Sequence, residues 1–184
     1  MLSADPATLR AAHGMGETTT AAIRIAHAAA IRLLRTRAKA APVLSNWQAL
    51  ADYLHADMAH DGVERFRVLH LNTRNMLIRD EVMSEGSIDQ AAVHVREVIR
   101  RAMDLGSAAI ILVHNHPSGD PTPSRDDIQL TRAIADAAKP LGIAGVMGGA
   151  STEMSASTTE VLIEADPVVE QCVGTQMSSD TAWM

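Results

Sequence analysis

The segment HNHPSGDPTPSRDD, residues 114–127, is the most informative part of this sequence. It follows the apolar run 108–113, whose length and β-branched residues predict a strand buried on both faces. Prolines and a glycine then exclude regular structure up to Ser124, a favoured N-cap residue that is expected to begin a helix. The inner stripe of this helix is predicted to be Leu130, Ile134, Ala138 and Leu141.

Two histidines and one aspartate in this stretch form a possible metal site. Alternate side chains of an extended chain point the same way, so His114 and His116 present two imidazoles to one side while Asn115 faces the other. Asp127, one turn into the helix, can add a carboxylate oxygen. Two imidazoles and one carboxylate, with a fourth position left to water, are typical of catalytic rather than structural zinc. Such a metal lowers the pKa of its bound water to about 7 and polarises a carbonyl.

The same residues also have a purely structural interpretation. Ser124-Arg125-Asp126-Asp127 resembles a capping box, in which the carboxylate of Asp127 serves the terminus of its own helix. Paired histidines beside Pro-Ser-Gly can simply lie in a surface loop. Spacing alone leaves both interpretations open.

The rest of the chain predicts an α/β protein. Its 184 residues suit one domain with an appendage, because domains typically have about 100–200 residues. A helical period gives way after Asp61-Gly62 to a period of two, which indicates a β-hairpin. The expected helices are 6–13, 17–39, 47–59 and 95–105, the hairpin strands are 66–71 and 76–84, and a further strand is possible at 160–163.

Composition excludes several classes of function. Aromatic residues make up 2% of the chain, which is too few for a base-stacking platform. The single cysteine, Cys172, excludes an internal disulfide and a thiolate zinc cluster, so any metal must bind His, Asp or Glu. No apolar run reaches the roughly 18–20 residues of a membrane span. A soluble, cytoplasmic protein without membrane contact is therefore expected.

The motif residues resemble a known family. His-x-His, seven residues, Ser, two residues and Asp match the JAMM (MPN-plus) metalloprotease motif, and the run 114–127 closely resembles the RadC family of bacterial JAMM-domain proteins. Residues 42–143 resemble this family throughout, including the hairpin around 71–75 and the Arg96-Glu97 helix start. The resemblance implies an MPN/JAMM-type α/β fold, similar to cytidine deaminase, in which helices flank a mixed sheet and a short helical hairpin precedes it.

This resemblance implies a zinc-dependent metallopeptidase that hydrolyses peptide or isopeptide bonds with a metal-activated water. His114, His116 and Asp127 would hold Zn²⁺, and a peptide or protein would be the substrate. Ser124 matches the motif serine, which donates to the oxyanion that forms at the attacked carbonyl.

JAMM enzymes also use an upstream glutamate as general base, just before the first core strand. Glu64, two residues before Phe66, matches that place. Glu81 and Glu85 on the neighbouring strand are competing candidates, and each glutamate can instead be a solvated strand-edge charge. His70 and His94 are expected to be packed or surface residues rather than ligands.

The amino end carries a second hypothesis, that of a DNA contact. Residues 1–40 have six basic and two acidic side chains, and their helix, Gly14-Met15-Gly16, helix pattern resembles part of a helix-hairpin-helix module. A DNA phosphate could bind through residues 10–39, where Arg24, Arg32, Arg35, Arg37 and Lys39 follow the turn. The alternative function is thus a non-enzymatic DNA-associated protein with a degenerate or scaffold MPN domain, in keeping with the family's link to DNA repair.

The carboxyl end departs from the family pattern. Residues 144–184 hold six acidic and no basic side chains and lack the family's strand with an Asp-His pair. A divergent or frameshifted tail, and an unpaired edge on the central sheet, are therefore expected. The predicted domains are a helical region at 1–40, an MPN/JAMM domain at 42–165 and a disordered tail at 166–184.

Overall fold

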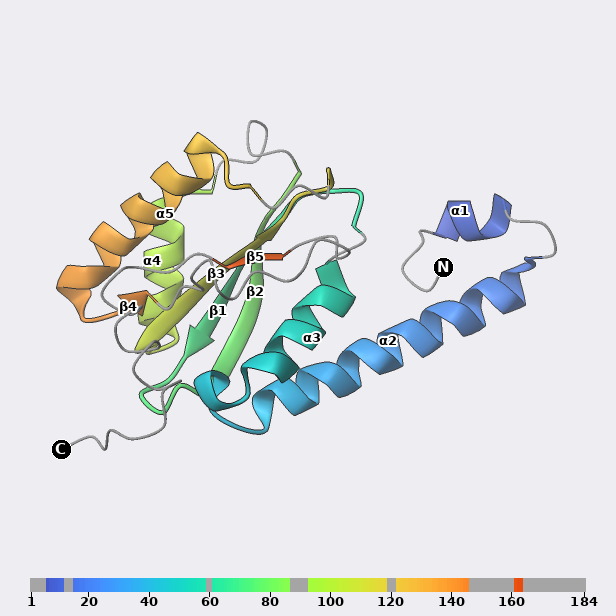
Figure 1. Ribbon diagram of the computed structural model, residues 1–184, viewed down its shortest axis with the longest axis horizontal. Coiled ribbons are helices and arrows are strands. Elements are labelled where there is room, and N and C mark those ends of the chain that lie inside the picture. The colour runs from blue at the N-terminus through green and yellow to red at the C-terminus, as the bar shows by residue number, and fades with distance from the viewer. Residues whose placement is uncertain are drawn as a thin grey trace.

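The computed structural model describes residues 6–11, 15–58, 61–86, 93–118, 122–145 and 161–163, and these form a mixed α/β architecture (Figure 1). Helices lie on both faces of one sheet, whose strand order is β2-β1-β3-β4, with β5 also paired to β3. The helices are α1 Pro6–Ala11, α2 Glu17–Lys39, α3 Trp47–Met58, α4 Val95–Asp104 and α5 Arg125–Ala138, with short 3₁₀ helices η1 Val43–Ser45 and η2 Lys139–Leu141. The strands are β1 Arg65–Leu71, β2 Leu77–Glu85, β3 Ala109–Asn115, β4 Ala144–Gly145 and β5 Val161–Ile163.

Strand β3 lies at the centre of the sheet, and every one of its residues is buried. This confirms the strand predicted from the apolar run. It pairs antiparallel with β1, in a register that puts Phe66 opposite His114 and Leu71 opposite Ala109. Because alternate side chains point to opposite faces, β1 and β3 contribute to two separate cores.

The two cores lie on opposite faces of the sheet, as the arrangement of helices in Figure 1 shows. Leu69, Ile111 and Val113 pack toward α3 and the end of α2. Val68, Ile110 and Leu112 pack toward α4 and α5. The face toward α4 and α5 is also the face of His114, because His114 has the same parity as Ile110 and Leu112.

Most predicted elements are confirmed, with one wrong position in the helix after Ser124. Ile134 and Ala138 are buried as expected, but Leu141 is 46% exposed. The α-helix ends at Ala138, and the tighter 3₁₀ turn of η2 changes the period, so Leu141 is rotated off the inner stripe.

The expectation of an unpaired edge on the central sheet is wrong for most of β3, because two short strands pair with it on the side away from β1. Strand β4 pairs with β3 in parallel at Ala109 and Ile110, and β5 pairs with it antiparallel at residues 113–115. The possible strand at 160–163 is therefore confirmed as β5. Residues 166–184 lie outside the described residues, and the predicted domain limits stay predictions.

A buried charge network, which the sequence did not reveal, joins β1 and β2 to α3. The Arg67 guanidinium donates to both carboxylate oxygens of Asp80, at 3.1 and 2.7 Å, and to the hydroxyl of Tyr53 at 2.9 Å. It also binds Asp57. The side chains of Arg67 and Asp80 are only 6% and 1% exposed. One sign of this network is visible in the sequence: by strand alternation, Arg67 lies on the same face as the apolar residues Leu69 and Leu71, so its charge needs a buried partner.

Removal of this arginine is expected to destabilise the fold strongly. Arg67→Ala leaves the Asp80 carboxylate buried without its main partner, which typically costs about 3–5 kcal/mol. Arg100→Ala is the matched control, because the Arg100 side chain is 56% exposed. An exposed pair of that kind contributes up to about 1 kcal/mol. Urea unfolding measures both losses, and equal losses in the two variants would contradict a structural role for the network.

Candidate metal centre

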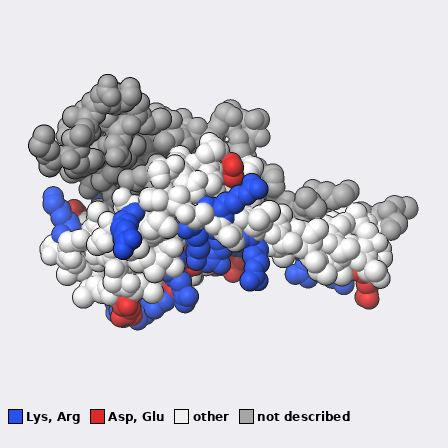
Figure 2. Space-filling view, turned by 90° about the horizontal axis from the view of Figure 1, so that it is seen from below, with Lys and Arg blue, Asp and Glu red and all other residues white. Residues whose placement is uncertain are grey.

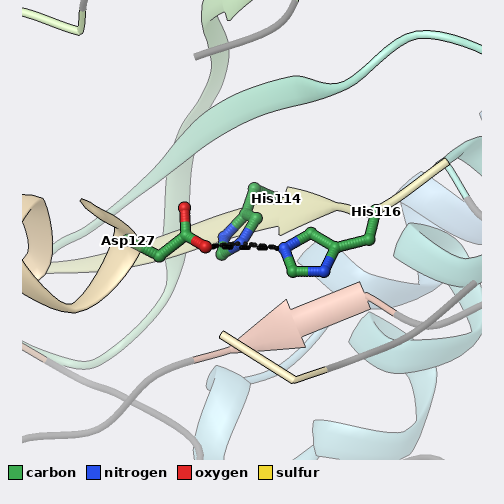
Figure 3. Close-up of side chains that lie close together, drawn as sticks. All are labelled: His114, His116 and Asp127. Atoms are coloured by element: carbon green, nitrogen blue, oxygen red, sulfur yellow. Dashed lines mark hydrogen bonds and ion pairs between the residues drawn. The ribbon is translucent and has the colours of Figure 1, made fainter. Parts of the chain in front are cut away.

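The candidate metal centre lies where β3 ends and α5 begins. His114 is the sixth residue of β3, and His116 follows the strand directly. Their Nε2 atoms lie 2.9 Å apart, and both rings face the same space (Figure 3). His114 is buried and His116 is half-buried. Strand alternation therefore brings the two imidazoles together, as the spacing predicted.

Asp127 completes the cluster from the first turn of α5. Its Oδ2 atom lies 3.6 Å from Nε2 of His114 and 3.6 Å from Nε2 of His116. Figure 3 shows the carboxylate pointing between the two rings. The sequence-predicted ligands therefore meet, although they come from two elements joined by a loop.

Asp127 also closes a capping box, which confirms the structural interpretation of this residue and leaves it available as a ligand. Its Oδ2 atom accepts from the backbone N–H of Ser124 at 2.7 Å, and its own N–H donates to the Ser124 hydroxyl at 3.1 Å. Burial favours a higher pKa, but the neighbouring His114 imidazole and the hydrogen bond from Ser124 outweigh it and hold the pKa of the Asp127 carboxyl well below its usual value. The carboxylate is therefore held in its anionic form, which is the form that a cation would need.

The geometry of the donor atoms fits a small divalent cation. The three atoms form a triangle with sides of 2.9, 3.6 and 3.6 Å. The equidistant point in the plane of the three atoms lies about 2.0 Å from each, which is close to the length of a zinc bond to imidazole nitrogen or carboxylate oxygen. Two nitrogens and one oxygen also leave a fourth tetrahedral position open. Zinc fits this set, and other divalent ions share the same ligands.

Ser124 lies beside the centre as the N-cap of α5. Its oxygen accepts from the Asp127 N–H, which leaves the hydroxyl hydrogen for another acceptor. The residue is exposed, so that acceptor can come from solvent or a ligand. Its predicted role as an oxyanion donor stays a prediction.

Glu64 lies one residue before β1, whose pairing with β3 begins at Phe66 and His114. The side chains of Phe66 and His114 share a face of the sheet because they lie opposite each other. Glu64 precedes Phe66 by two residues, so strand alternation continued past the paired residues would bring Glu64 to the face of the candidate metal centre. The role of Glu64 as general base stays a prediction.

The competing carboxylates are bound to arginines elsewhere. Glu81 accepts from Arg101 at 2.9 Å and from Arg79 at 3.0 Å, which holds the pKa of its carboxyl at about 2. Glu85 accepts from Arg65 at 2.9 Å. Both glutamates lie on β2, which β1 separates from β3. The choice of general base among the three glutamates stays a prediction.

The histidines expected to be structural lie away from the cluster. His70 is fully buried, and its Nδ1 atom lies 2.9 Å from the Ser107 hydroxyl. Burial lowers the pKa of His70, which favours its neutral form. His94 is an exposed N-cap of α4.

The residue between the two histidines, Asn115, has partners that the sequence did not predict. Asn115, only 2% exposed, donates from Nδ2 to the carbonyl of Val63 at 3.1 Å and accepts on Oδ1 from the N–H of Arg65 at 2.9 Å. An asparagine at the end of a buried apolar strand indicates such partners, because a buried side-chain amide must form hydrogen bonds.

The cations proposed to contact DNA lie on α2. Arg24, Arg32 and Arg37 are exposed, whereas Arg35 approaches Asp80, with 4.0 Å between its Nε and the carboxylate. Figure 2 shows Lys and Arg side chains gathered near the middle of one face, with fewer along the arm that carries α1 and the start of α2. DNA contact through residues 10–39 stays a prediction. Among the described helices, none is both long enough and apolar enough to cross a membrane.

Comparison with known proteins gives a family match over the same region. The sequence model of the RadC-like JAB domain matches residues 44–146. The chain is 51% identical over 143 residues to a UPF0758 protein of Rhodobacter capsulatus, an alignment that covers 78% of the chain and 67% of the relative. It is 45% identical over 143 residues to a UPF0758 protein of Ruegeria pomeroyi, covering 78% and 64%. The chain thus spans about two thirds of the length of these relatives.

Substitutions in the capping box should separate its two functions. Asp127→Asn keeps an oxygen that can accept from Ser124 but loses the anionic ligand. Zinc affinity is expected to fall by more than the roughly 10–100-fold that loss of an orienting contact costs. Ser124→Ala keeps all three ligands, so its zinc affinity should stay within about that range, while the lost cap destabilises the protein by about 1 kcal/mol.

Competition with a chromophoric zinc chelator measures the affinity, and urea unfolding of the metal-free proteins measures the stability. Wild-type zinc affinity in Asp127→Asn would contradict the assignment of this carboxylate as a ligand.

Proposed function

Because the chain belongs to the family of RadC-like JAB domain proteins, we propose that it is a metal-dependent hydrolase of peptide or isopeptide bonds. One observation carries this proposal. Nε2 of His114, Nε2 of His116 and Oδ2 of Asp127 form a triangle whose dimensions suit a divalent cation with one open position. Zinc is the ion that this donor set favours.

Each protein residue has a separate task in the proposed reaction. His114, His116 and Asp127 would hold the cation, which lowers the pKa of a bound water and polarises the substrate carbonyl. The capping hydrogen bonds fix the Asp127 carboxylate before the metal binds. Less rotational freedom is therefore lost when the ligands close on the ion.

The remaining steps are proton transfer and charge stabilisation. Glu64 would accept the proton of the attacking water and pass it to the leaving amine as the C–N bond breaks. The Ser124 hydroxyl would donate to the carbonyl oxygen as negative charge develops there. Its exposure at the start of α5 supports this role, because a substrate carbonyl must reach it from solvent.

Loss of the proposed base should abolish turnover without loss of the metal. In Glu64→Gln the amide cannot accept a proton, so kcat is expected to fall by about 10²–10⁴-fold. The histidines and Asp127 are unchanged, so zinc content should equal that of the wild type. The assay follows cleavage of a library of quenched fluorescent peptides that includes members linked through the Lys ε-amine.

Glu85→Gln is the matched control, because Glu85 is also a carboxylate near a strand end of this sheet but lies on β2, which β1 separates from β3. It should retain wild-type kcat. Hydrolysis at the wild-type rate in Glu64→Gln would contradict the assignment of Glu64 as the base. Zinc-loaded wild type that cleaves no member of the library would contradict the proposed activity.

A further inference from the structure

We propose that Asn115 is a positioning residue that fixes Glu64 against the metal centre, an inference that rests on the proposed function. Asn115 lies between the two histidine ligands in the sequence, but its side chain leaves β3 on the opposite face of the sheet. The Asn115 side chain therefore lies on the other face of β3 from His114 and does not face a metal ion or substrate bound at the two histidines.

The side chain of Asn115 forms hydrogen bonds with the backbone of the two residues that flank Glu64. Its Nδ2 donates to the Val63 carbonyl at 3.1 Å, and its Oδ1 accepts from the Arg65 N–H at 2.9 Å. The backbone register between β1 and β3 is paired up to Phe66 and His114. Beyond that pair, the side-chain amide of Asn115 forms the hydrogen bonds to the segment before Phe66. It can do so because, like a peptide group, it offers a donor and an acceptor.

Glu64 itself is held by its backbone from the other side. Its carbonyl accepts from the Gly86 N–H at 2.9 Å, at the end of β2. The segment 63–65 is thus tied to β3 through Asn115 and to β2 through Gly86. Because the Asn115 side chain is almost fully buried, water cannot easily replace it as a partner for these backbone groups.

The position of residues 63–65 matters for catalysis because a general base at Glu64 must lie within hydrogen-bond distance of the water whose proton it accepts. A misplacement of about 1 Å can cost roughly 10²-fold in rate. Loss of the Asn115 amide frees the Val63 carbonyl and the Arg65 N–H, and Glu64 lies between them. The substrate lies on the other face, so its binding should not change.

The test compares Asn115→Ala and the isosteric Asn115→Asp in the zinc-loaded protein. Asn115→Asp keeps an acceptor for Arg65 but puts a second acceptor against the Val63 carbonyl, so it should also lower kcat. For the best-cleaved peptide of the fluorescent library, Asn115→Ala is expected to lower kcat by about 10²-fold with KM and zinc content unchanged. In the Glu64→Gln background, the same substitution should cause no further loss of kcat, because Asn115 acts through Glu64.

A second readout does not depend on activity or metal. In metal-free, ¹⁵N-labelled protein, exchange of the Arg65 amide hydrogen should be at least about 10-fold faster in Asn115→Ala than in the wild type. Ser107→Ala is the matched control, because Ser107 is a buried hydrogen-bonding residue just before the opposite end of β3. It should leave both kcat and Arg65 exchange unchanged.

The outcomes separate the two proposals. A zinc-loaded wild type without hydrolysis overturns the proposed function and the positioning role with it. An active wild type whose kcat survives in Asn115→Ala, or a further fall of kcat when Asn115→Ala is added to Glu64→Gln, overturns the positioning role alone. Unchanged Arg65 exchange in both Asn115 variants also overturns it.

Discussion

The burial of β3 on both faces is the constraint on which the candidate site depends. Helices α2 and α3 cover one face of the sheet and α4 and α5 cover the other, so every side chain of β3 must suit a packed environment. Apolar residues satisfy this up to Val113. His114 and Asn115 are polar and buried, and each has polar partners in the same region.

The Asp127 carboxylate shows how one group can serve the fold and the site together. As the third residue of α5, it binds the free backbone N–H of Ser124 and places negative charge at the positive end of the helix. The same oxygen lies 3.6 Å from both imidazoles. The capping box therefore orients this carboxylate toward the two imidazoles as soon as the helix forms.

Local patterns carried most of what the sequence could predict. Periodicity and capping rules predict the buried strand, the paired histidines and the helix start at Ser124, because each depends on residues within one short segment. The partners of Asn115 and Arg67 follow from strand register and helix packing between segments far apart in the chain. The short strands β4 and β5 have few residues to define a pattern, and their pairing with β3 is a tertiary effect.

Zinc K-edge X-ray absorption spectroscopy of the purified protein would show whether His114, His116 and Asp127 bind the ion, because it reports the number and kind of its ligands. We expect a bound ion surrounded only by nitrogen and oxygen at about 2.0–2.1 Å, with the outer-sphere scattering of two imidazoles. An ion without histidine scattering, or a zinc-reconstituted sample that retains no ion after desalting, would contradict it.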